Sequence, residues 1–192
     1  MFAFARLTSL LLALGLGLAA PPAIPPAHAE MDMYLTNPLF EMVQKGDTSE
    51  LKRQFLGGEF GGPNTSDLDE RTLLMAAASH NRVEVLDLLL AEGAVVGLTD
   101  KAGNTALSWA ARDSSLRAAE RLLAVGADPN HQNSQGLTPL MLAVQADDAA
   151  LVEALLKAGA DPGLADHAGQ DALLWARDAR DPRILGLLEN AY

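Results

Sequence analysis

The sequence contains no cysteine among its 192 residues. This absence excludes disulfides, thiolate zinc sites, a cysteine nucleophile and a lipidated N-terminal cysteine. Aromatic residues are also few, at 5%, although 49% of the residues are hydrophobic and many of these are Ala and Leu. Ala and Leu favour helices that pack closely, so we expect an all-α fold that packing alone holds together.

Basic residues are scarce and unevenly placed. All 25 acidic residues but only 13 of the 14 Lys and Arg residues follow residue 29, so the chain from Glu30 onward has a formal charge of −12. Such a surface repels phosphate groups, and we therefore expect neither a nucleic-acid partner nor an anionic membrane partner. A basic protein would be attracted to it.

The first 29 residues differ from the rest of the chain. Arg6 precedes an apolar run over residues 7–20, which is too short to span a hydrocarbon core of about 30 Å. Ala27-His28-Ala29 then places small residues at the positions that a signal peptidase reads. We predict a signal peptide over residues 1–29 and a periplasmic or secreted product that is free of the membrane. A retained membrane anchor is the alternative.

The remainder of the chain repeats itself at a spacing of 33 residues. The aligned columns hold a Thr or Asp that can cap a helix, two Leu, one Ala and a turn Asp or Asn. They comprise Thr72, Thr105, Thr138 and Asp171; Leu74, Leu107, Leu140 and Leu173; Leu89, Leu122, Leu155 and Leu188; Ala77, Ala110, Ala143 and Ala176; and Asp67, Asp100, Asn133 and Asp166. Gly103, Gly136 and Gly169 form a further column in which Glu70 is the exception, and Gly93, Gly126 and Gly159 are placed to close the second helix of each unit.

These units resemble the ankyrin repeat, whose pattern is D-x-x-G-x-T-P-L-H-x-A-A followed by E-V-V-x-L-L-L-x-x-G-A-D-x-N. The clearest copies are DKAGNTALSWAA with AERLLAVGADPN and NSQGLTPLMLAV with LVEALLKAGADP. The resemblance covers residues 37–192 and implies an all-α solenoid of about five helix-turn-helix units with β-turn fingers. Full units would span residues 67–99, 100–132 and 133–165. An N-terminal capping repeat with a Gly-rich connection (30–66) and a C-terminal capping repeat (166–192) would flank them.

The sequence departs from the family pattern in two columns. The usual His is replaced by Met75, Ser108, Met141 and Leu174, and the usual Gly between the helices by Asn81, Ser114, Asp147 and Arg180. Of the latter residue types, only Asn and Asp adopt left-handed geometry readily. We therefore predict a moderately stable array whose most strained junction lies near Arg180.

The resemblance also implies a binding surface on the inner, concave side, made of turn tips and the exposed side of the first helices. Matched column by column, this surface comprises Leu68, Asp69, Arg71, Ser79, His80, Lys101, Ala102, Asn104, Arg112, Asp113, Ser134, Gln135, Leu137, Gln145, Ala146, His167, Ala168, Gln170, Asp178 and Ala179. These columns vary from unit to unit, as positions free to specialise would. Neutral variation of a surface would give the same pattern.

The sequence offers little for catalysis or metal binding. His80, His131 and His167 share no column, DLDERT does not match a calcium loop, and no His accompanies the serines near Asp113. We predict no cofactor, no metal site and no enzymatic activity. Trp109 and Trp175 lie one residue before the Ala column, where core packing is favoured over a ligand platform.

Three functions remain open at this stage. The first is a monomeric exported module that binds, assists or protects an envelope protein. In size and plan the chain resembles small exported bacterial ankyrin proteins linked to peroxide defence. The second is an immunity or inhibitor protein that neutralises a basic envelope toxin or enzyme, which suits the acidic charge. The third is an enzyme, and no constellation of residues supports it.

Export has a direct test. Because residues 1–29 have the plan of a signal peptide, the mature protein isolated from its host should begin at Glu30. N-terminal sequencing of the soluble native protein checks this, and an intact Met1 would contradict it.

Overall fold

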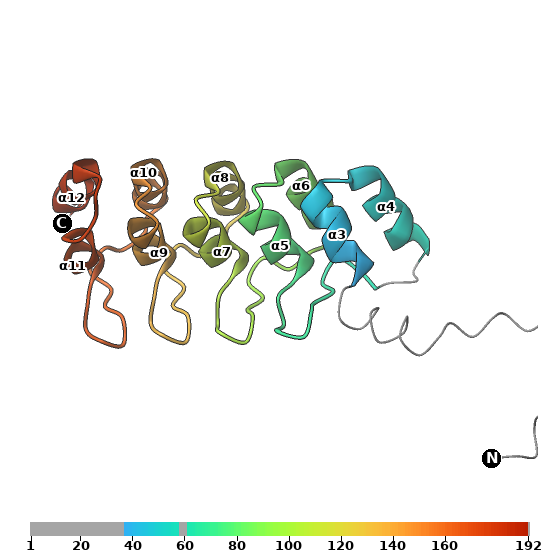
Figure 1. Cartoon of the computed structure of the whole chain (residues 1–192), viewed down its shortest axis with the longest axis horizontal. Helices are drawn as coiled ribbons and strands as arrows, with labels where there is room; N and C mark the ends of the chain where they lie inside the picture. Colours follow the sequence, from blue (N-terminus) through green and yellow to red (C-terminus); the bar gives the residue numbers. More distant parts are fainter. Residues whose placement is uncertain (1–36, 58–60, 192) are drawn as a thin grey trace, which may run out of the picture. The chain divides into compact units, whose positions relative to one another are not determined.

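The computed structural model describes residues 37–57 and 61–191, and these residues form ten helices with no strand among them. The helices follow one another in five pairs, which lie side by side in chain order (Figure 1). The pairs are α3 (Pro38–Lys45) with α4 (Thr48–Gly57), α5 (Leu73–Ser79) with α6 (Val83–Ala91), α7 (Ala106–Arg112) with α8 (Leu116–Ala124), α9 (Pro139–Gln145) with α10 (Ala149–Lys157), and α11 (Ala172–Ala176) with α12 (Pro182–Glu189). The predicted all-α repeat fold is confirmed. The predicted signal peptide lies outside the described residues.

The first helix of each full unit begins where the capping column predicts. Side-chain oxygens of Thr72, Thr105, Thr138 and Asp171 accept hydrogen bonds from the backbone N–H three residues ahead. These bonds satisfy a donor that the helix itself leaves unpaired. Two of the residues that replace the family His also help, because Met75 Sδ and Ser108 Oγ accept a hydrogen bond from the N–H of the capping Thr.

The core runs through all five pairs. The Leu89, Leu122, Leu155 and Leu188 column is fully buried, and the Ala77, Ala110, Ala143 and Ala176 column is at most 3% exposed. The small Ala side chains allow α5, α7, α9 and α11 to approach one another closely. Because each pair covers the apolar face of the next, the array and not the single unit is the folded species.

A loop with a turn at its tip, here called a finger, precedes each of the helices α5, α7, α9 and α11. In every finger one side-chain oxygen, from Asp67, Asp100, Asn133 or Asp166, accepts backbone N–H groups two and four residues ahead. Neighbouring fingers are joined by single backbone hydrogen bonds, which Lys101, Ser134 and His167 donate to the preceding finger over 2.9–3.0 Å. The four fingers therefore form one connected edge.

The junction near Arg180 is not strained, so that prediction is wrong. Asn81, Ser114 and Asp147 have positive φ angles of 53°, 52° and 60°, but Arg180 does not. The reason is that α11 has five residues, against seven in α5, α7 and α9, so the chain reaches α12 by a different path. Left-handed strain instead falls on Ser114, the one residue of the three whose type does not favour it, and on Glu70, which has a φ of 61° in the first finger.

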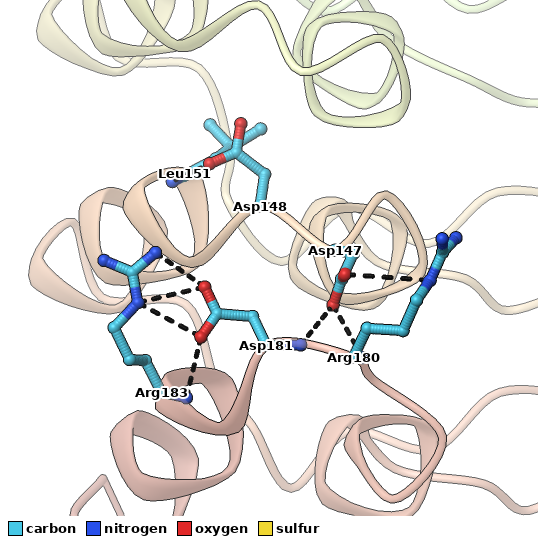
Figure 2. A network of polar contacts seen from close by, with 6 residues as sticks. All are labelled: Asp147, Asp148, Leu151, Arg180, Asp181 and Arg183. Atoms are coloured by element: carbon cyan, nitrogen blue, oxygen red, sulfur yellow. Dashed lines mark hydrogen bonds and ion pairs between the residues drawn. The ribbon is translucent and has the colours of Figure 1, made fainter.

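The last junction is also fastened by side chains, as Figure 2 shows. Asp147 Oδ1 accepts hydrogen bonds from the backbone N–H groups of Arg180 and Asp181 over 2.9 and 3.0 Å. Asp181 in turn accepts from the N–H and the guanidinium of Arg183, which lowers the pKa of its carboxyl group. The carboxylate between α9 and α10 therefore holds the last helix pair in place.

A clamp between successive loops is present twice and missing once. The side-chain amides of Asn64 and Asn130 each donate to a glycine carbonyl 29 residues ahead and accept an N–H two residues further on. Gly97 occupies the same column between them. A cleft of about 150 Å³ lies there, and a Cβ at Gly97 would meet no atom within 4 Å.

Replacing Gly97 with Asn should therefore stabilise the array. The Asn side chain would add the two hydrogen bonds that Asn64 and Asn130 make in their loops, and Asn leaves the unfolded chain less flexible than Gly does. Together these effects predict a gain of about 1 kcal/mol in the free energy of unfolding. Urea denaturation measures it. The matched variant Asn130→Gly should lose a similar amount, and a Gly97→Asn protein no more stable than the wild type would show that this loop cannot adopt the clamped geometry.

Candidate protein-binding surface

The structure leaves nearly all of the predicted surface residues accessible. Those that are exposed are Leu68, Asp69, His80, Lys101, Ala102, Arg112, Asp113, Ser134, Gln135, Gln145, His167, Ala168 and Asp178. Those that are half-buried are Arg71, Ser79, Leu137, Ala146, Gln170 and Ala179. We call the side of the array formed by the four fingers and helices α5, α7, α9 and α11 the inner face.

Asn104 is the one member of this set that is buried. Its side chain donates to the Asp100 carboxylate over 3.2 Å and accepts from Asn133 Nδ2 over 2.8 Å. The short amide thus joins two successive fingers. A substitution here would disturb the scaffold before it affected a partner.

A groove of about 770 Å³ lies on the inner face, between the second, third and fourth fingers and the helices behind them. Ten of the predicted residues line it: Ala102, Asn104, Arg112, Ser134, Gln135, Leu137, Gln145, His167, Ala168 and Gln170. Asn133, Leu142, Asp166 and Trp175 complete the lining. The predicted residues of the first full unit, from Leu68 to His80, do not reach this groove.

Trp175 was missed as a groove residue because the sequence pattern assigned it to the core. It does pack partly against the core, but its indole Nε1 donates to Asp166 Oδ2 over 3.1 Å. Trp109 makes the equivalent bond to Asp100 over 2.9 Å. The available signal was the spacing, because each Trp follows a finger Asp by nine residues.

The Asp166 carboxylate is fully committed to the scaffold. The backbone hydrogen bond from Gln170 lowers the pKa of Asp166, the bonds from Trp175 and Ala168 act in the same direction, and burial opposes them. Because the ionised form is the one that accepts these bonds, the carboxylate closes the finger and orients the indole at neutral pH.

A second cluster surrounds Trp109 on the inner face. The guanidinium carbons of Arg71 and Arg112 lie 4.0 and 3.6 Å from the centre of its ring. Arg71 also donates from Nη2 to Ser79 Oγ. Burial lowers the pKa of Arg71, and the nearby carboxylates of Asp67 and Asp113 oppose that shift. Two cations are thus held against one aromatic ring.

The carboxylates of Asp67 and Asp148 have structural tasks. Asp67 closes its finger, and Asp148 caps α10 by accepting from Leu151 N over 3.1 Å. Within residues 37–57 and 61–191, no three His, Asp or Glu side chains gather closely enough to share a metal ion. In the same part of the chain, no helix is long and apolar enough to cross a bilayer.

The fold and the inner face define an all-helical repeat protein with a recognition surface built on its fingers. A family model described as ankyrin repeats (three copies) matches residues 39–133 and 115–190, and the chain belongs to the ankyrin repeat family. Such repeats are in general protein-binding modules, and proteins built from them are typically non-enzymatic scaffolds. No curated protein matches the chain.

Variants of Asp166 test how the groove is held. Asp166→Ala removes the acceptor of three N–H groups and should cost about 1–3 kcal/mol of stability at pH 7. Asp166→Asn should cost less, because Asn133 closes its finger with the same amide oxygen.

The dependence of stability on pH is a second test of the role of Asp166. The folded pKa of Asp166 lies below its ordinary value of 3.8, so its contribution is present above that value and is lost as the pH falls through the folded pKa. The difference in urea midpoint between the wild type and Asp166→Asn should shrink from pH 7 to pH 3. A constant difference would contradict a role for the ionised carboxylate.

Proposed function

We propose that the chain is an exported protein-binding module that holds a partner protein of the cell envelope in the inner-face groove and thereby assists or protects it. The observation that carries this proposal is that some residues of the fingers hold the array together, while other residues of the fingers and of α9 are exposed along the groove. Asp100, Asn104 and Asn133 hold the fingers together, whereas Ser134, Gln135 and Gln145 are exposed along the groove. The export half of the proposal rests on the sequence of residues 1–29.

The groove has the features of a surface for recognising a polypeptide. It is open, it extends over three successive fingers, and its lining mixes side-chain amides with an indole and Leu side chains. Amides can pair with a peptide backbone, while Trp and Leu supply apolar contact. A partner in peroxide defence, suggested by the resemblance to small exported bacterial ankyrin proteins, is compatible with this surface.

A second function is favoured by the acidic charge of the chain as a whole. On α6, α8 and α10 the acidic residues Glu84, Asp87, Glu120 and Glu153 are exposed, and Arg121 and Lys157 pair with Asp87 and Glu153. An immunity or inhibitor protein could use the exposed carboxylates of this side to neutralise a basic envelope toxin or enzyme. The two functions therefore place the partner on different sides of the array.

Matched pairs of bulky substitutions distinguish these sides. Ser134→Tyr with Ala168→Tyr fills the groove, and Glu84→Tyr with Arg117→Tyr adds the same bulk to α6 and α8; all four positions are exposed. The wild-type protein should capture its partner from an envelope extract, the groove variant should lose it, and the α6–α8 variant should keep it. Release by the α6–α8 variant alone would support the second function.

Two controls complete the experiment. Leu89→Ala should lower stability by about 2–5 kcal/mol through a buried cavity and weaken capture only as far as it unfolds the array. The activity of the captured partner, measured with and without the protein, separates the roles: protection preserves the activity under stress, and inhibition abolishes it.

A further inference from the structure

The groove differs in charge from the chain that forms it. The whole protein has a formal charge of −11. Among the described residues that line the groove, however, the one carboxylate is Asp166, which already accepts three hydrogen bonds. Arg112 brings a positive charge to the lining, and the guanidinium of Arg71 stacks on the same indole as that of Arg112. The lining of the groove therefore carries one positive and one negative charge, although the protein as a whole is strongly acidic.

The two guanidinium groups are held in place before any partner arrives. Both stack on Trp109, and Trp109 is itself fixed by its hydrogen bond to Asp100. Stacking on an indole restrains the long Arg side chain and leaves its N–H edge available. A ligand that binds there loses less free energy to the ordering of side chains.

Some guanidinium donors are not used within the protein. Arg71 Nε has no hydrogen-bond partner among the described residues, but it is buried, so a ligand reaches it only after the side chains around it move. Arg112 Nε lies 3.6 Å from Asp113 Oδ1, which is an ion pair without a hydrogen bond. A guanidinium carries five N–H donors in a planar fork that matches a carboxylate, and a buried donor without an acceptor is costly.

The neighbouring carboxylates do not accept hydrogen bonds from these guanidinium groups. Asp67 accepts from backbone groups of its own finger, and Asp100 accepts from its finger and from Trp109. They reduce the local positive charge, and together with Asp113 they would repel a doubly charged phosphate more strongly than a singly charged group. A singly charged carboxylate suits the site better.

We propose that Arg71 and Arg112, stacked on Trp109, form the anchor for an Asp or Glu side chain carried by an extended segment of the partner protein that lies in the groove. This inference rests on the proposed function and adds the chemistry of the partner. The segment runs from the anchor past Gln135 and Gln145 toward Trp175, so that its backbone meets side-chain amides.

Blocked pentapeptides test the anchor without the natural partner. The probes are acetyl-Gly-Ser-Glu-Ser-Gly-amide and the same peptide with Gln in place of Glu. Titration of the purified protein is followed by the NMR signals of the Nε–H groups of Arg71 and Arg112 and of the Trp109 indole. The Glu peptide should shift these signals saturably and bind about tenfold more tightly than the Gln peptide. Equal binding of the two peptides, or tighter binding of free sulfate than of the Glu peptide, would overturn the proposal.

Variants at exposed positions give opposite predicted effects. Arg112→Gln should weaken binding of the Glu peptide about tenfold, and Arg112→Lys should restore only part of it, because an ammonium lacks the planar fork. Asp113→Asn should strengthen binding, because it removes a competing carboxylate beside Arg112. Arg117→Gln on α8 removes the same charge at an exposed position outside the groove lining and should change nothing. Equal effects of Arg112→Gln and Arg117→Gln would contradict the anchor.

Partner capture separates failure of this inference from failure of the proposed function. Loss of the partner in both the groove variant Ser134→Tyr/Ala168→Tyr and in Arg112→Gln supports both. Loss in the groove variant alone overturns the anchor and leaves the protein-binding function intact. Retention by both variants, with melting temperatures unchanged, overturns the groove assignment itself.

Discussion

Everything on the inner face depends on the side-chain oxygen that closes each finger. One oxygen of Asp67, Asp100, Asn133 or Asp166 replaces the backbone acceptor that a turn cannot supply to two of its N–H groups. Closure brings the residue five positions ahead into place to cap the first helix. Where the residue is Asp, its second oxygen is free to fix an indole, as it does at Asp100 and Asp166. A single local interaction thus builds the scaffold and orients two indoles, of which Trp175 lines the groove.

The parts of the structure that could be predicted are those that local chemistry decides. Capping by Thr72 and its equivalents, closure of the second helices at Gly93, Gly126 and Gly159, and burial of the Leu and Ala columns each follow from a residue type at a fixed position in the repeat. The repeat multiplies this evidence, because one pattern seen four times is a stronger signal than any single motif.

The parts that were missed depend on residues far apart in the sequence or on the length of an element. Asn104 is buried because Asn133, 29 residues away, offers its amide as a partner. Arg180 avoids left-handed geometry because α11 ends two residues early, which no residue near Arg180 signals. Trp109 meets Arg71 across two units. A column-by-column comparison treats units as equivalent, so it cannot detect contacts that only one pair of units makes.

Contacts that one pair of units alone makes are separate from the interactions that fold the array. The folding interactions recur from unit to unit, whereas the Arg71–Trp109–Arg112 stack occurs once among the described residues. The charges of the protein then act at two ranges. At physiological salt, exposed charges are screened beyond about 8 Å, so the negative charge of the chain as a whole influences encounter and orientation more than the final contact. In the proposed anchor, the guanidinium groups of Arg71 and Arg112 would act over hydrogen-bond distances and select the residue that docks. An acidic protein can therefore attract a partner that is basic as a whole and still recognise it through one acidic side chain.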